Sequence, residues 1–220
     1  KNMNKKEIFI RYVIFILGLF INSLGVALIT KANLGTSPIS SIPFTLSLSF
    51  TPTIGQFTIF FSLLLILIQI VLERKKYQPI QLLQIPVSVA FGYFIDFSMD
   101  YIFFWVNPQN YIQAIIYLLI GCLILGFGVY MEVFANVVML PGEGTVKSIT
   151  KTFGTNFGTT KVAMDVSMSV IALILSLIMT HQIQGVREGT IIAALLVGFI
   201  SRFFSRICKP VEHKILAQAF

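Results

Sequence analysis

Long apolar runs separated by short polar segments dominate the chain. Six runs approach the roughly 20 apolar residues that a helix needs to cross a lipid bilayer. They cover residues 8–30, 54–72, 79–106, 111–131, 160–180 and 189–207. This pattern predicts an all-α membrane protein with about six transmembrane helices, forming a single transmembrane domain over residues 1–220. The third run is long enough to tilt, and we expect Pro86 to kink it.

The distribution of Lys and Arg predicts the orientation of these helices. With the N terminus inside, thirteen of the sixteen Lys and Arg residues lie on the cytoplasmic side. Only Lys31 and Arg187 lie outside, and Lys161 stands at the inner end of the fifth helix. Cytoplasmic loops are enriched in Lys and Arg. We therefore predict cytoplasmic N and C termini and a cytoplasmic tail over residues 208–220.

Residues 36–50 form a shorter apolar segment that is rich in Ser, Thr and Pro. A full span here would move the basic residues 74–76 to the outer side. We therefore predict a re-entrant or interfacial segment entering from the outer side. Irregular backbone at membrane depth requires protein or a water-filled cavity around it.

The two halves of the chain repeat their Gly, Asn and Pro residues at a constant offset of 103 positions. These residue types mark special backbone conformations rather than general apolarity. The matched pairs are Gly25 with Gly128, Asn33 with Asn136, Pro38 with Pro141, and Gly55 with Gly158.

Each half holds three spans and one interrupted segment, so the sequence predicts two repeats. Repeat one covers about residues 8–106 with a broken segment at 36–50, and repeat two covers about 111–207 with one at 141–153. Three is an odd number, so the second three-helix repeat is inverted relative to the first, as in many transporters. Broken helices of this kind place N-terminal amides in the membrane, where they can hold an anionic group. Ordinary interfacial helices are the alternative.

Composition narrows the function classes. The chain is 56% hydrophobic and only 11% charged, which is too little charge for a water-exposed surface, so we expect the lipid bilayer as its partner. Its net charge of +7 is explained by cytoplasmic loops, and we expect no nucleic acid as a partner. No nucleotide-binding motif, metal-ligand spacing or catalytic triad is recognisable. We therefore expect no cofactor, no metal and no enzymatic activity.

Charged residues near or inside the spans are the first candidates for a substrate site, because charge in a membrane is costly and usually functional. Lys161 and Asp165 are four residues apart and share a helix face. They form either a structural lock or part of a substrate site. Glu143 and Lys147 have the same spacing in the inner broken segment. They belong either to a solvated helix start or to a gate near the inner mouth.

Polar side chains supply the remaining candidates. The outer broken segment offers amide and hydroxyl groups that either hold a polar ligand or cap a helix. We expect the glutamines in the second and third spans to face inward, away from lipid. Glu132 ends the fourth span and is either interfacial or on the path. The further candidates for substrate binding are Asn33, Thr36, Ser37, Ser40, Gln56, Gln84 and Asn136.

Three stretches carry a likeness to a known family: KANLGTSP at residues 31–38, which is the most specific, TIGQFTIFF at 53–61 and PGEGTVKSITKTFG at 141–154. They resemble the YczE/YyaS/YitT family of bacterial integral membrane proteins. Ile39 stands where many relatives have an aromatic residue. The resemblance implies a protein of the bacterial cytoplasmic membrane, and members of the family are usually described as permeases. It supplies no substrate residues.

These observations predict a secondary transporter, a small-molecule permease for a small polar or zwitterionic metabolite. Lys161 and Glu143 would engage opposite charges of the substrate, and Asp165 would position Lys161 or couple a proton. A channel-like facilitator with mirrored half-helices is the alternative, followed by a membrane enzyme or an accessory subunit. Ala194 and Gly198 have the small-xxx-small spacing that permits close helix packing, within the chain or in a homo-oligomer.

Overall fold

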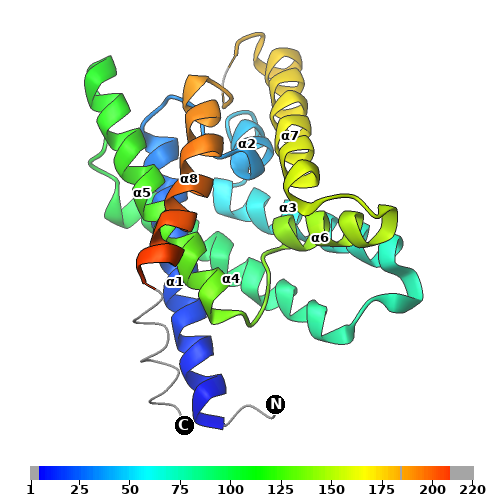
Figure 1. Cartoon of the computed structure of the whole chain (residues 1–220). Helices are drawn as coiled ribbons and strands as arrows, with labels where there is room; N and C mark the ends of the chain where they lie inside the picture. Colours follow the sequence, from blue (N-terminus) through cyan, green and yellow to red (C-terminus); the bar gives the residue numbers. More distant parts are fainter. Residues whose placement is uncertain (1–4, 184, 209–220) are drawn as a thin grey trace.

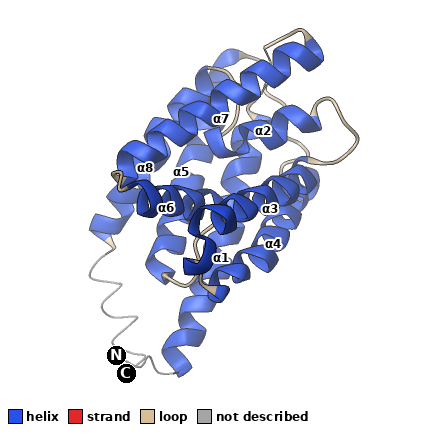
Figure 2. Cartoon of the chain, turned by 90° about the vertical axis from the view of Figure 1, so that its right-hand side faces the viewer, coloured by secondary structure: helices blue, strands red, loops and turns tan. Residues whose placement is uncertain are grey.

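The computed structural model describes residues 5–183 and 185–208, and this part of the chain contains helices and loops but no strand (Figures 1 and 2). Its six helical segments long and apolar enough to cross a membrane are Lys5–Lys31, Ile54–Lys76, Pro79–Ile102, Tyr111–Ala135, Phe157–Thr180 and Glu188–Ile207. The predicted all-α, six-span class is therefore confirmed. Apart from Cys208, the predicted cytoplasmic tail lies outside the described residues.

Two short helices interrupt the order of spans. Helix α2 (Pro38–Ser47) follows α1 (Lys5–Lys31), and α6 (Pro141–Phe153) follows α5 (Tyr111–Ala135). Proline occupies the first helical position in both, where its fixed φ favours the helix and its missing N–H breaks no intrahelical bond. The turns before them contain Asn33 and Asn136, which both adopt left-handed backbone with φ of 59° and 49°. Asn tolerates this conformation better than most residues, so the repeated residue type matches a repeated conformation.

The third span is assembled from a 3-10 helix η2 (Pro79–Leu83), α4 (Gln84–Phe97) and a π-helical turn η3 (Ser98–Ile102). Pro86 lies in the first turn of α4, where its missing N–H leaves no intrahelical bond unmade. The kink predicted at Pro86 stays a prediction, and the departures from α-helix lie before and after α4.

Helices α1 and α5 cross at glycine residues. A methyl group added at Gly25 would lie 2.5 Å from the backbone N and Cα of Leu125. One added at Gly128 would lie 2.5 Å from the backbone N of Asn22. Asn22 and Leu125 are themselves 103 positions apart. Each of the two contacts therefore becomes the other when every residue is replaced by its counterpart 103 positions away in the other half of the chain.

The two short helices also make contacts that correspond at the offset of 103 positions. Helix α2 packs on α7 (Phe157–Thr180), and α6 packs on α3 (Ile54–Glu73) (Figure 1). The Ser41 hydroxyl donates to the backbone carbonyl of Met168 at 3.5 Å. The Thr145 hydroxyl lies 3.3 Å from the carbonyl of Leu65, which stands 103 positions before Met168. Each short helix therefore rests on a long helix of the other half.

Helix α8 (Glu188–Ile207) packs on α5. Its Ala194 and Gly198 are exposed, and a methyl group added at Gly198 would meet nothing within 4 Å. The small-residue spacing on α8 therefore has no partner helix within the described part of this chain.

Candidate functional site

A cavity of about 270 Å³ lies at the end of the bundle where α3, α4, α5 and α6 meet. Its wall is rich in amides and charged groups. It is built by the ends of the spanning segments, by α6 and by the loops beside them. The polar and charged residues on the wall are Gln69, Glu73, Gln78, Gln81, Gln84, Glu132, Asn136, Glu143, Lys147 and Ser148. The volume is slightly below the roughly 300–1,000 Å³ of typical small-molecule sites.

A pair of buried glutamines forms one part of this wall. The amides of Gln69 and Gln84 exchange two hydrogen bonds of 3.0 and 3.1 Å, and both residues are almost fully buried. The Gln69 amide also donates to the carbonyl of Pro141 at 3.1 Å. Thr145 adds a contact of 3.3 Å to the same Gln69 nitrogen. The pair thus satisfies polar groups that would be costly in lipid and holds the first turn of α6 against α3 and α4.

Glu73 anchors the middle of α6 to the end of α3. Its carboxylate accepts a hydrogen bond from the Ser148 hydroxyl at 2.7 Å and forms an ion pair with Lys151 at 2.9 Å. The Glu73 side chain is only 3% exposed, whereas that of Lys151 is 48% exposed. The charge of Glu73 is therefore balanced from within the protein.

Two further carboxylates on the wall lie close enough for their charges to repel. Glu132 on α5 is buried and accepts a hydrogen bond of 2.8 Å from the Asn22 amide on α1. Glu143 in the first turn of α6 accepts no hydrogen bond from the described residues, and it interacts electrostatically with Lys161 and Asp165. Burial raises the pKa of the Glu143 carboxyl; Lys161 lowers this pKa, and Asp165 raises it further.

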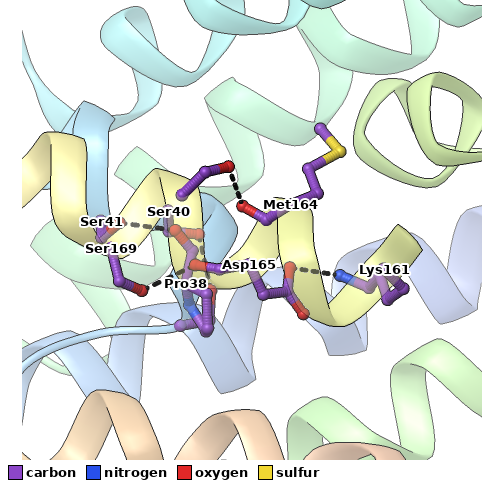
Figure 3. Close-up of polar contacts among 9 residues, drawn as sticks. Pro38, Ser40, Ser41, Lys161, Met164, Asp165 and Ser169 are labelled. Carbon is purple, nitrogen blue, oxygen red and sulfur yellow. Dashed lines mark hydrogen bonds and ion pairs between the residues drawn. The ribbon is translucent and has the colours of Figure 1, made fainter. Parts of the chain in front are cut away.

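Lys161 and Asp165 form the ion pair expected from their spacing, with Nζ 2.7 Å from the carboxylate (Figure 3). They are not on the wall of the cavity described above. Both side chains are partly exposed, and they lie on α7 beside the first turns of α2, where Pro38 and Ser41 are drawn in Figure 3. Glu143 is the group that links the cavity electrostatically to this pair.

The first turns of α2 and α6 touch near this point. A methyl group added at Gly142 would overlap the end of the Ile39 side chain. The N-terminal ends of the two short helices therefore meet between the long helices, with Glu143 one residue from the contact.

Of the candidates around the outer segment, Asn33 is exposed, whereas Thr36, Ser37 and Ser40 are buried in protein rather than placed on the cavity wall. Thr36 is fully buried: its backbone N–H donates to the Thr190 hydroxyl at 3.2 Å, and its own hydroxyl lies 3.0 Å from that of Thr30. Ser37 donates to Ser40 at 2.9 Å and makes no side-chain cap to α2.

Nearby, Arg187 donates to the backbone carbonyl of Asn33 at 3.0 Å. Gly189 N–H donates to the carbonyl of Leu34 at 2.8 Å. These bonds join the loop after α1 to the start of α8, so the segment is closed on this side.

The prediction that the glutamines of the second and third spans face inward is right for one of them and wrong for the other. Gln84 faces inward, as predicted. Gln56 is exposed and completes a capping box with Thr53 at the start of α3, so the inward placement predicted for it is wrong. A capping box satisfies two backbone N–H groups that the helix itself cannot, which explains the polar residue there.

Of the predicted site residues, the cavity brings together Gln84, Asn136, Glu143 and Lys147. Sequence reasoning missed Asn22, Gln69 and Glu73, which hold the wall in place. Asn22 and Gln69 lie inside long apolar runs, and Glu73 ends one. That position was the available signal, because a polar group facing lipid would be costly. No group of three or more His, Cys, Asp or Glu placed to hold a metal ion occurs in residues 5–183 and 185–208.

The fold and this polar interior define a multi-span integral membrane protein. The chain belongs to a family of unknown function, DUF6198, whose model matches residues 9–206. It is 28% identical over 202 residues to the uncharacterized membrane protein YczE of Bacillus subtilis, covering 90% of this chain and 87% of the relative. It is also 28% identical over 124 residues to the uncharacterized protein YyaS of the same organism, covering 56% of this chain and 60% of that protein. No solved structure matches significantly.

Proposed function

We propose that this protein is a transporter for a small polar or zwitterionic metabolite in a bacterial cytoplasmic membrane, and not an enzyme. One observation carries the proposal: a cavity of about 270 Å³, lined by amides and charged side chains, lies among helices of membrane-spanning length. Polar groups in that position are costly unless they meet a ligand or one another.

The relation between the two halves supports transport. The contacts that exchange at an offset of 103 residues, at the α1–α5 crossing and at the short helices, fit two repeats of inverted orientation. Inverted repeats allow a protein to alternate between inward-open and outward-open states around a site at their interface. Walls from α3 and α4 on one side and from α5 and α6 on the other fit such an interface.

The orientation follows from the positive residues around the cavity. Arg74, Lys75 and Lys76 follow α3, and Lys147 and Lys151 lie on α6, at the same end of the bundle as the cavity. Since cytoplasmic loops are enriched in Lys and Arg, we place the cavity on the cytoplasmic side. The bonds of Arg187 and Thr190 to the loop after α1 close the outer side, so the arrangement corresponds to an inward-open carrier.

The test is uptake by proteoliposomes of the purified protein, presented with a defined mixture of amino acids, sulfur compounds, vitamins and inorganic ions. Retained solutes are identified by mass spectrometry against protein-free liposomes. We expect one class to enter with saturation, and Glu143→Gln to reduce its entry. Asp100→Asn, which removes an exposed carboxylate that is not on the cavity wall, is the matched control and retains uptake. If no solute enters above the protein-free level, the transport function is rejected.

A channel-like facilitator is the second candidate, and the meeting of the α2 and α6 N-terminal ends at Ile39 and Gly142 favours it. A pore between such half-helices would pass solute without saturation. Uptake rates that rise linearly with solute concentration, and charge variants that change selectivity without stopping flux, would favour the channel over the carrier.

A further inference from the structure

The three carboxylates of the cavity differ in what balances their charge. Glu73 is paired with Lys151, and Lys147 also lies near enough to stabilise its negative charge. Glu132 receives a hydrogen bond only from the neutral Asn22 amide, among the contacts of the described residues. Glu143 receives none. Lys147 and Lys151 are therefore directed to Glu73, and no cation among the described residues contacts the other two carboxylates.

Lys161, the cation that attracts Glu143, already forms an ion pair with another carboxylate. Lys161 attracts Glu143 electrostatically, but its ammonium group is bound to Asp165 at 2.7 Å. Glu132, on the opposite side, repels Glu143. Two like charges at a buried site raise each other's energy unless a positive group lies between them.

A third acceptor on the same wall also lacks a partner. The carboxamide oxygen of Gln81 is fully buried, and no donor among the described residues reaches it. A buried polar atom without a hydrogen bond is destabilising, and such atoms are uncommon in folded proteins. Since Gln81 belongs to η2 and Glu143 to α6, this observation is independent of the carboxylates. Because the oxygen is shielded from solvent, the Gln81 side chain must turn toward the cavity before a ligand there can donate to it.

We propose that the cavity binds a small solute through a protonated amine, held between Glu132 and Glu143, with the Gln81 side chain turning to accept a further hydrogen bond. An ammonium group supplies up to three N–H donors and one positive charge, which are the features that this wall lacks. The inference rests on the proposed transport function and narrows its substrate to amine-bearing solutes. A carboxylate on the same solute would find Lys147 on the wall.

Four solutes with the same four-carbon chain test the charge preference: putrescine, 4-aminobutyrate, 1,4-butanediol and succinate. The thermal midpoint of the purified protein is measured against the concentration of each at constant ionic strength. A ligand that binds only the folded state raises the midpoint as its concentration rises. We expect the two amine-bearing solutes to raise it and the diol and succinate to leave it unchanged.

Glu143→Gln keeps the shape of the side chain and removes its charge. We expect it to raise the apparent Kd of the amine-bearing solutes by roughly tenfold or more, since hydrogen bonds to charged groups are the strong ones. Because it also removes a repulsion, we expect the ligand-free variant to unfold at or above the wild-type midpoint. Glu132→Gln is the second variant with the same expectations, and Asp100→Asn is the control that keeps the wild-type response.

The proposal is overturned if succinate or butanediol protects as well as the amines, if no amine protects, or if both Gln variants respond as wild type does. Swelling of proteoliposomes in the same four solutes separates this result from the transport function. Entry without preference for amines leaves a transporter and removes the amine site. Protection by amines without entry of any solute keeps the amine site and counts against transport.

Discussion

Gly25 lies at one of two close backbone contacts between α1 and α5, and its replacement by Ala has an effect that follows from the geometry. The added methyl group would lie 2.5 Å from the backbone of Leu125, whereas ordinary contacts begin at 3.4 Å. The two helices must therefore separate locally by about 0.9 Å, the difference between these distances. Backbone atoms have no rotamer by which to move aside, so the strain falls on the crossing itself.

Two opposing contributions set the size of the effect. Overfilling a packed interior typically costs about 1–3 kcal/mol. Replacing Gly by Ala inside a helix contributes about 1 kcal/mol in the opposite direction. Because the clash involves backbone, we expect a net loss of about 1–2 kcal/mol in the free energy of unfolding. That corresponds to a midpoint lowered by about 2–8 °C for a chain of this size.

Cys122 offers a direct assay for this prediction. The chain has two cysteines, and Cys122 on α5 is fully buried. In a Cys208→Ser background, a thiol-reactive fluorophore therefore reports the opening of the bundle through Cys122 alone. The thermal midpoint is read from the fluorescence on heating in detergent.

Gly198→Ala is the matched control, because the same change on α8 meets nothing within 4 Å. We expect its midpoint to stay at or slightly above that of the parent. If Gly25→Ala unfolds at the same temperature as Gly198→Ala, the close crossing of α1 and α5 is wrong.

Three further predictions concern the cavity wall. Gln69→Leu leaves the buried Gln84 amide without its partner and should lower the free energy of unfolding by about 1–3 kcal/mol. The double variant with Gln84→Leu should recover part of this loss, and additive losses would contradict the pairing. Lys151→Ala should lower the free energy of unfolding by about 1–2 kcal/mol, a value reduced because Lys151 is half-exposed. Much of this loss should vanish in a Glu73→Gln background, where the ion pair is already absent. Protection by putrescine should weaken on acidification, because an amine binds the ionised carboxylate. Since burial raises the pKa of Glu143, this loss of protection should begin at a higher pH than for an ordinary carboxyl group. Protection that is independent of pH down to 4 would contradict this last expectation.

The sequence by itself determined the class of fold and the positions of its elements. Apolar runs of membrane-spanning length gave six spans, because lipid requires about 20 apolar residues in succession. The repeated Asn and Pro residues located both short helices, since Asn33 and Asn136 take left-handed backbone and Pro38 and Pro141 begin a helix. These features depend on local chemistry, which a sequence carries directly.

The tertiary structure alone decided which polar residues share a site. Gln69 and Glu73 are far in sequence from the α6 residues they hold, and only the packing of α3 against α6 brings them together. The same packing left the Lys161–Asp165 pair outside the cavity. The capping box of Gln56 and Thr53 is a local contact, which the sequence carries by itself. A helix period tells which residues share a face but not what that face meets. What a helix face meets is decided by contacts between distant parts of the chain, such as the crossing of α1 and α5 at glycine residues.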